Sequence, residues 1–132
     1  MSKRSLRPTD ITLHRQSRLL EVAFEDGARF RFPCEFLRVY SPSAEVRGHG
    51  PGQETLPLGK ENVNIARIEP VGNYAVRLCF DDGHDTGLYS WDWLHYLGTE
   101  QSRLWDEYLA KLAQAGHERK PGAGAGASDD VA

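Results

Sequence analysis

The chain has 132 residues, a size typical of one domain, and its hydrophobic fraction of 39% is enough for a packed core. No apolar run approaches the roughly 20 residues of a membrane helix, and nothing after Met1 resembles a signal peptide. Two cysteines, Cys34 and Cys79, are too few for a disulfide framework or a three-cysteine zinc site. The net charge of −3 argues against nucleic-acid binding. We therefore expect a soluble, cytoplasmic protein that binds neither nucleic acid nor membranes.

The two ends of the chain differ in composition from its middle. Residues 1–9 are basic and show no apolar periodicity, and residues 116–132 contain the Gly/Ala run Gly122–Ala127. The Gly/Ala run has no large apolar side chain whose burial would offset the entropy lost on ordering. The sequence therefore predicts a flexible N-terminus (1–9), one folded domain (10–115) and a disordered tail (116–132).

The first half of the folded part has the pattern of β-strands. Apolar and polar residues alternate in Ile11–Arg15, and again in Leu20–Phe24 and Arg29–Phe32 on either side of Glu25-Asp26-Gly27. An Asp-Gly pair supplies the backbone angles that a tight hairpin needs. The pattern predicts a first strand followed by a β-hairpin.

The same design recurs in the second half. Tyr74–Phe80 and His84–Tyr89 flank Asp81-Asp82-Gly83, and Ala66–Val71 precedes them as a further strand. Together with the first hairpin, these segments predict an antiparallel sheet of five or six strands.

After Tyr89 the apolar period changes from two residues to about 3.6, which indicates helices. Ser90 is a suitable N-cap for a short helix that Gly98 can end, and Thr99 is a suitable N-cap for a longer helix that ends at Gly116. The tryptophans fall on the apolar faces of these helices, so we interpret them as core residues. The predicted fold class is α+β, an antiparallel β-sheet built from hairpins with C-terminal helices packed on one face.

A Gly/Pro-rich stretch, Arg47–Lys60, lies between the two strand-rich halves. Gly59-Lys60 invites comparison with a phosphate-binding P-loop, but the glycine spacing is wrong and Glu61 stands where a Ser or Thr would bind the metal. Nucleotide hydrolysis by this loop is therefore rejected. A weaker alternative stays open, in which an enzyme binds a small anion through this loop and nearby arginines.

No catalytic set is recognisable among the cysteines and histidines. Cys34 and Cys79 lack the glycine-flanked turn of a catalytic nucleophile. His84 has carboxylates beside it, which should raise its pKa, but a single imidazole is a poor start for a metal site. None of the five histidines has an acidic residue two positions on, so an iron-dependent oxygenase site is not expected.

Two separated motifs point to a known family. Phe36–Arg47, followed by Asp82–Trp91 with its Asp-Gly-His and Tyr-Ser-Trp elements, resembles the gamma-butyrobetaine hydroxylase-like N-terminal domain family over roughly Ile11 to Leu97. The family's oxygenases hold a structural zinc in this domain with three cysteines and a histidine, so the resemblance implies where such a site would lie in this chain. Those positions here are Ser41, Ser43, Val46 and His84. Serine and valine cannot replace thiolates on zinc, so no metal or other cofactor is expected.

The chain is also too short for the catalytic domain of such oxygenases, and it looks like the short stand-alone bacterial members of the family. We therefore expect a non-catalytic accessory module that acts through one or more protein partners. Its expected interaction surface joins the two motifs and comprises Arg38, Tyr40, Ser41, Ser43, Arg47, His49, Asp82, His84, Tyr89 and Trp91.

The alternative is a metal-binding or iron–sulfur-assembly-related protein that uses His84 with Cys34, Cys79 or His49. By analogy, the family's domain also occurs fused to iron–sulfur-cluster carrier ATPases.

Overall fold

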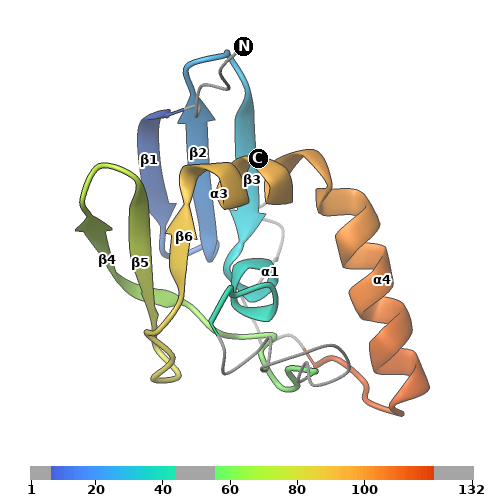
Figure 1. The fold of residues 1–132 in the computed structure, drawn as a ribbon. Coiled ribbons are helices and arrows are strands. Elements are labelled where there is room, and N and C mark those ends of the chain that lie inside the picture. Colours follow the sequence, from blue (N-terminus) through green and yellow to red (C-terminus); the bar gives the residue numbers. More distant parts are fainter. Residues whose placement is uncertain (1–6, 44–55, 121–132) are drawn as a thin grey trace.

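A computed structural model describes residues 7–43 and 56–120 of the chain. Figure 1 shows two three-stranded sheets side by side, a short helix below them and two helices at the C-terminal end of the domain. The six strands of this described part form two antiparallel sheets, with orders β1-β2-β3 and β4-β5-β6.

The first sheet contains β1 (Pro8–His14), β2 (Leu19–Phe24) and β3 (Arg29–Pro33). The hairpin between β2 and β3 is closed by Asp26, whose Oδ1 accepts the backbone N–H of Ala28 at 2.9 Å. Gly27 has a φ of +91°, a conformation that glycine adopts without strain. The predicted Asp-Gly turn is confirmed.

The second sheet contains β4 (Ile65–Val71), β5 (Ala75–Phe80) and β6 (Leu88–Ser90). The turn after β5 repeats the first hairpin: Gly83 has a φ of +92°, and Asp82 Oδ1 accepts the backbone N–H of His84 at 3.2 Å. The second arm is shorter than predicted, because only Leu88–Ser90 pairs with β5. Residues 84–87 instead form an irregular segment beside the short helix.

Three helices complete the described structure: α1 (Cys34–Val39), α3 (Trp91–Thr99) and α4 (Gln101–Gln114). The predicted N-cap of α3 is confirmed, because Ser90 Oγ accepts the backbone N–H of Trp93 at 3.1 Å. The predicted cap at Thr99 is wrong: α3 continues through this residue, and the Thr99 hydroxyl donates to the Tyr96 carbonyl. None of the described helices is both long and apolar enough to span a membrane.

One hydrophobic core connects both sheets and all three helices. Its largest fully buried side chains are Tyr89, Phe32, Phe36, Leu20, Leu37, Ile65, Leu78, Leu94 and Leu97. The tryptophans lie at its margin, half-buried against it rather than within it. Burial of this apolar surface is the main driving force for the fold.

The α+β class predicted from the sequence is confirmed, with two differences. The strands form two sheets instead of one, and α1 was not predicted. Pro33 does end β3, but its φ of −60° also suits the start of a helix, and α1 follows at once.

The ends of the described chain differ from the predicted boundaries. β1 begins at Pro8, two residues before the expected start of the domain. After α4, Arg119 makes two hydrogen bonds to the buried carboxylate of Glu35, at 2.9 and 2.6 Å, and the backbone N–H of Lys120 donates to Glu61 at 2.9 Å. Residues 119 and 120 of the predicted tail therefore contact the rest of the domain, and the domain boundaries themselves stay a prediction. The remainder of the tail, 121–132, and residues 1–6 lie outside the described residues.

The contact between α3 and β3 leads to a stability prediction. A Cβ atom at Gly98 would overlap the ring of Phe30. We expect Gly98→Ala to lower the free energy of unfolding by about 1–3 kcal/mol through overpacking, as measured by urea denaturation. In a Phe30→Leu background the same change should cost less. Equal costs in both backgrounds would contradict this account.

Candidate functional site

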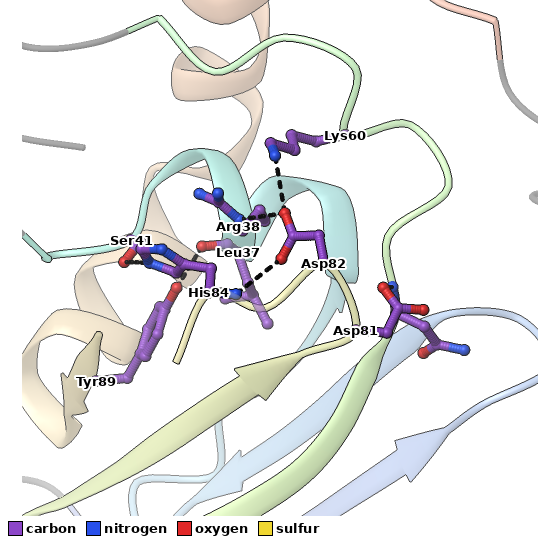
Figure 2. A network of polar contacts seen from close by, with 9 residues as sticks. Leu37, Arg38, Ser41, Lys60, Asp81, Asp82, His84 and Tyr89 are labelled. Atoms are coloured by element: carbon purple, nitrogen blue, oxygen red, sulfur yellow. Dashed lines mark hydrogen bonds and ion pairs between the residues drawn. The ribbon is translucent and has the colours of Figure 1, made fainter. Parts of the chain in front are cut away.

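The two sequence motifs that carry the resemblance lie against each other in the structure (Figure 2). The end of α1 and the residues after it contact the turn and irregular segment between β5 and β6. The prediction that these segments are neighbours is confirmed. Their contacts form two groups, which we call the Ser41–His84 cluster (Ser41, Ser43, His84 and Thr86) and the Arg38–Asp82 cluster (Arg38, Lys60 and Asp82).

The Ser41–His84 cluster is held by hydroxyl groups. Ser41 Oγ and His84 Nε2 are hydrogen-bonded at 2.9 Å, and both residues are buried. Ser41 Oγ also accepts the backbone N–H of Ser43 at 3.2 Å, while Ser43 Oγ and Thr86 Oγ1 are 2.6 Å apart. Because buried polar groups are costly when unpaired, these bonds fix the loop after α1 onto the β5–β6 segment.

Gly87 allows this close approach. A Cβ atom at this position would overlap Ser41 Oγ and crowd the Tyr89 ring. The Tyr89 side chain is completely buried, and its hydroxyl donates to the Leu37 carbonyl near the end of α1. Gly87 and Tyr89 thus bring the segment before β6 into direct contact with α1.

The Arg38–Asp82 cluster lies beside the first one (Figure 2). Arg38 Nε and Lys60 Nζ both donate to Asp82 Oδ2, at 2.9 and 2.8 Å. Burial by itself would raise the pKa of Asp82, but the hydrogen bonds from Lys60, the His84 backbone N–H and Arg38 outweigh it and lower the pKa to about 2. Asp82 is therefore ionised at neutral pH.

The interaction surface stays a prediction, and its members differ in how accessible they are. Five of its members are buried and make internal contacts, so they cannot meet a partner without rearrangement: Tyr40, Ser41, Ser43, His84 and Tyr89. Arg38 and Asp82 are partly accessible. Arg47 and His49 lie outside the described residues.

Trp91, the remaining member, lies at the other end of β6 from His84. Its indole Nε1 donates to the Asn73 carbonyl at 2.8 Å, and its backbone N–H donates to the Tyr74 carbonyl, so it contacts the turn between β4 and β5. Here two adjoining hollows of about 390 and 380 Å³ share Arg7, Asn73 and Trp91. We call this feature the Trp91 groove. Its lining residues are Arg7, Pro8, Thr9, Asp10, Ile11, Asn73, Tyr74, Ser90, Trp91 and Asp92.

The comparisons with known proteins decide the family. The family model described as gamma-butyrobetaine hydroxylase-like, N-terminal, matches residues 11–95, more than half of the chain. The chain belongs to this family. The matched range contains both clusters and ends within α3.

Solved structures of similar proteins support the same assignment for this gamma-butyrobetaine hydroxylase-like domain. Two NMR solution structures are 54% and 47% identical, with TM-scores of 0.76 and 0.77; their alignments cover 92% and 91% of this chain and 92% and 94% of those chains. A crystal structure from Acidithiobacillus ferrooxidans, described as a protein with unknown function of the DUF971 family, is 39% identical with a TM-score of 0.58. That alignment covers 70% of this chain and 92% of the other. No curated protein matches the chain.

The zinc site implied by the resemblance does not fit the donors in this domain. Ser41 and Ser43 present hydroxyls in place of thiolates, and the Nε2 atom of His84 is hydrogen-bonded to Ser41. The fourth position, Val46, lies outside the described residues. The hydroxyls of Ser41 and Ser43 and the Nε2 atom of His84 are instead engaged in hydrogen bonds.

The cysteines do not supply another site in the described part of the chain. Burial raises the pKa of the Cys34 thiol to about 12, so it stays protonated, and its Sγ lies 3.7 Å from Asn64 Oδ1. Cys79 is buried in β5, where Arg67 donates to its sulfur. Residues 7–43 and 56–120 contain no group of three or more His, Cys, Asp or Glu side chains arranged to hold a metal ion.

Sequence reasoning missed three residues that the structure brings to these features. Lys60 was assigned to the glycine-rich stretch and is instead a partner of Asp82. Asn73 and Tyr74 belong to the turn that meets Trp91. Nothing local in the sequence shows which helix approaches that turn.

The buried Ser41–His84 bond predicts a stability loss on removal of the hydroxyl. We expect Ser41→Ala to lower the free energy of unfolding by about 1–3 kcal/mol, because it removes the buried hydroxyl that bonds His84 Nε2 and accepts the Ser43 backbone N–H. Urea denaturation measures this. The same change at the exposed Ser102 should alter stability by less than about 0.5 kcal/mol. Similar values for both variants would refute the structural role of the bond.

The low pKa of Asp82 predicts a pH dependence of stability. Folding lowers this pKa, so the stabilisation is complete above the ordinary Asp value, near pH 4, and is lost as the pH falls toward about 2. The wild-type protein should lose stability as the pH falls from about 5 to about 2. Because solvent screens the Asp82 ion pairs, we expect the Asp82→Asn variant to lose about 1 kcal/mol less unfolding free energy than the wild type over this range. Asp106→Asn, on the exposed face of α4, is the control and should retain the wild-type profile.

Proposed function

We propose that this gamma-butyrobetaine hydroxylase-like domain is a non-catalytic binding module that acts through contacts with a partner protein. The observation that carries the proposal is the Trp91 groove, which offers a half-buried tryptophan, an exposed tyrosine and an arginine in one concave surface. Trp, Tyr and Arg are the residue types that contribute most often to the binding energy of protein interfaces.

The aromatic residues of the groove are held in place before any partner binds. Two hydrogen bonds attach Trp91 to the turn between β4 and β5. Tyr74 is 55% exposed, and its ring lies against Gly72, which has a φ of +55° and no side chain to displace the ring. Rigid side chains lose less conformational entropy on association, so this arrangement favours binding.

An extended segment of the partner is the occupant that suits the groove best. One wall is formed by β1, which within the described residues pairs with β2 alone and is there an edge strand. The outer backbone groups of an edge strand are available for pairing with an added strand. Arg7 contributes a positive charge to the groove, and Asp10 and Asp92 contribute negative charges, so charged side chains of the partner can be selected by position.

The state of the polar residues supports a non-catalytic role. A general base or nucleophile must reach a substrate, but Ser41 and His84 are buried and bonded to each other, and Asp82 is bonded to two cations. The Cys34 thiol, with its pKa raised to about 12 by burial, is not a nucleophile at neutral pH.

We expect Tyr74→Ser to weaken partner binding at least tenfold, because it removes an exposed aromatic contact without opening the core. The measurement is quantitative affinity capture from a lysate of the source cell, followed by titration of the captured partner. Tyr96→Ser is the matched control, because Tyr96 is 42% exposed and lies outside the groove.

A photo-crosslinking amino acid at position 74 should form a covalent adduct with the same partner, and one at position 96 should not. The proposal fails if no partner is captured at native abundance. It also fails if both tyrosine variants lose the same partner equally.

A further inference from the structure

The Arg38–Asp82 cluster contains more positive than negative charge. Arg38 and Lys60 donate to the same carboxylate oxygen of Asp82, and the other oxygen accepts the backbone N–H of His84. Two cations therefore share one anion whose acceptor oxygens are already used. The cluster carries an excess of one positive charge.

Among residues 7–43 and 56–120, the neighbouring carboxylates do not balance this excess. Asp81 lies on the far side of Asp82 from Arg38 (Figure 2), and its Oδ1 accepts the backbone N–H of Asn64 at 3.0 Å. Glu35, on the same helix as Arg38, is bonded to Arg119. Glu61, next to Lys60 in the chain, accepts from Lys120 and contacts His117.

The guanidinium of Arg38 also has an unused donor. Its Nη1 is buried and has no hydrogen-bond acceptor among residues 7–43 and 56–120. An unpaired buried N–H on a charged group is costly, and native structures rarely leave one unpaired. The Arg38 and Lys60 side chains are only 11% and 21% exposed. Partial burial strengthens the attraction of these two side chains to an anion, because the local dielectric constant is lower than in water. The part of each side chain that stays exposed lets an anion approach.

We propose that Arg38 and Lys60 form a binding site for an oxyanion, either a carboxylate or a phosphate group. The accessible part of the planar guanidinium donates to an oxygen of the ligand, and the Lys60 ammonium, which shares Asp82 Oδ2 with Arg38 Nε, donates to the same ligand. Asp82 sets the positions of both cations and stays ionised. The site is separate from the Trp91 groove, so its existence does not depend on the proposed partner binding.

The test is NMR titration of ¹⁵N-labelled protein with sodium phosphate and, separately, with sodium acetate, each at constant ionic strength set by sodium chloride. We expect saturable shifts of the Arg38 Nε–H signal and of the Lys60 and Asp82 amides. Tighter binding of phosphate would identify a phosphoryl ligand, and tighter binding of acetate would identify a carboxylate; both support an oxyanion site. Linear shifts equal to those caused by chloride would overturn it.

Variants separate this site from general charge effects. Lys60→Gln should weaken binding about tenfold, because one charge-assisted hydrogen bond is lost. Arg38→Gln should abolish saturation; if that variant does not fold, Lys60→Gln decides alone. Arg103→Gln is the matched control, because Arg103 also bridges two carboxylates, Glu100 and Glu107, but on the exposed face of α4. Equal effects of Arg103→Gln and Lys60→Gln would overturn the proposal.

Discussion

The fold depends on the short helix α1 and on the groups that satisfy its end. A helix of six residues is not stable alone, since most of its backbone groups have no partner within it. Here the Leu37 carbonyl accepts the Tyr89 hydroxyl, and the Tyr40 carbonyl accepts Trp93 Nε1 at 3.1 Å. The Tyr40 hydroxyl donates in turn to the Leu104 carbonyl of α4 at 2.8 Å. The second sheet, α3 and α4 are therefore all bonded to one turn of the chain.

This arrangement divides the polar residues of the two family motifs into internal and accessible groups. Ser41 and His84 lie inside, where their hydrogen bond fixes the loop after α1 and is unavailable for chemistry. Arg38 and Lys60 remain partly accessible, because they meet Asp82 at the margin of the same contact. Trp91 is accessible for a different reason: it begins α3 at the opposite end of β6, where the turn of the second sheet meets the edge of the first. Residues close together in the chain, such as Asp82 and His84, therefore differ in whether they are accessible or buried.

Local sequence signals predicted those parts of the structure that depend on residues close together in the chain. The alternation around Asp26-Gly27 and Asp82-Gly83 predicted both turns, and Ser90 predicted the start of α3. By contrast, α1 has too few residues to show a helical period. The division into two sheets and the Trp91 groove depend on non-local packing, which brings together segments as far apart in the chain as Arg7 and Trp91.

The Ser41–His84 cluster shows how the family fold is held in a chain without the implied thiolates. A structural zinc ion contributes roughly 10 kcal/mol or more to holding its ligands together, whereas a single hydrogen bond contributes about 1 kcal/mol. No one bond in the cluster can replace such an ion. The same two segments are also joined by the Tyr89 hydroxyl on Leu37 and by the Arg38–Asp82 ion pair, and they share the buried core. The junction is therefore stabilised by several small contributions rather than by one large one.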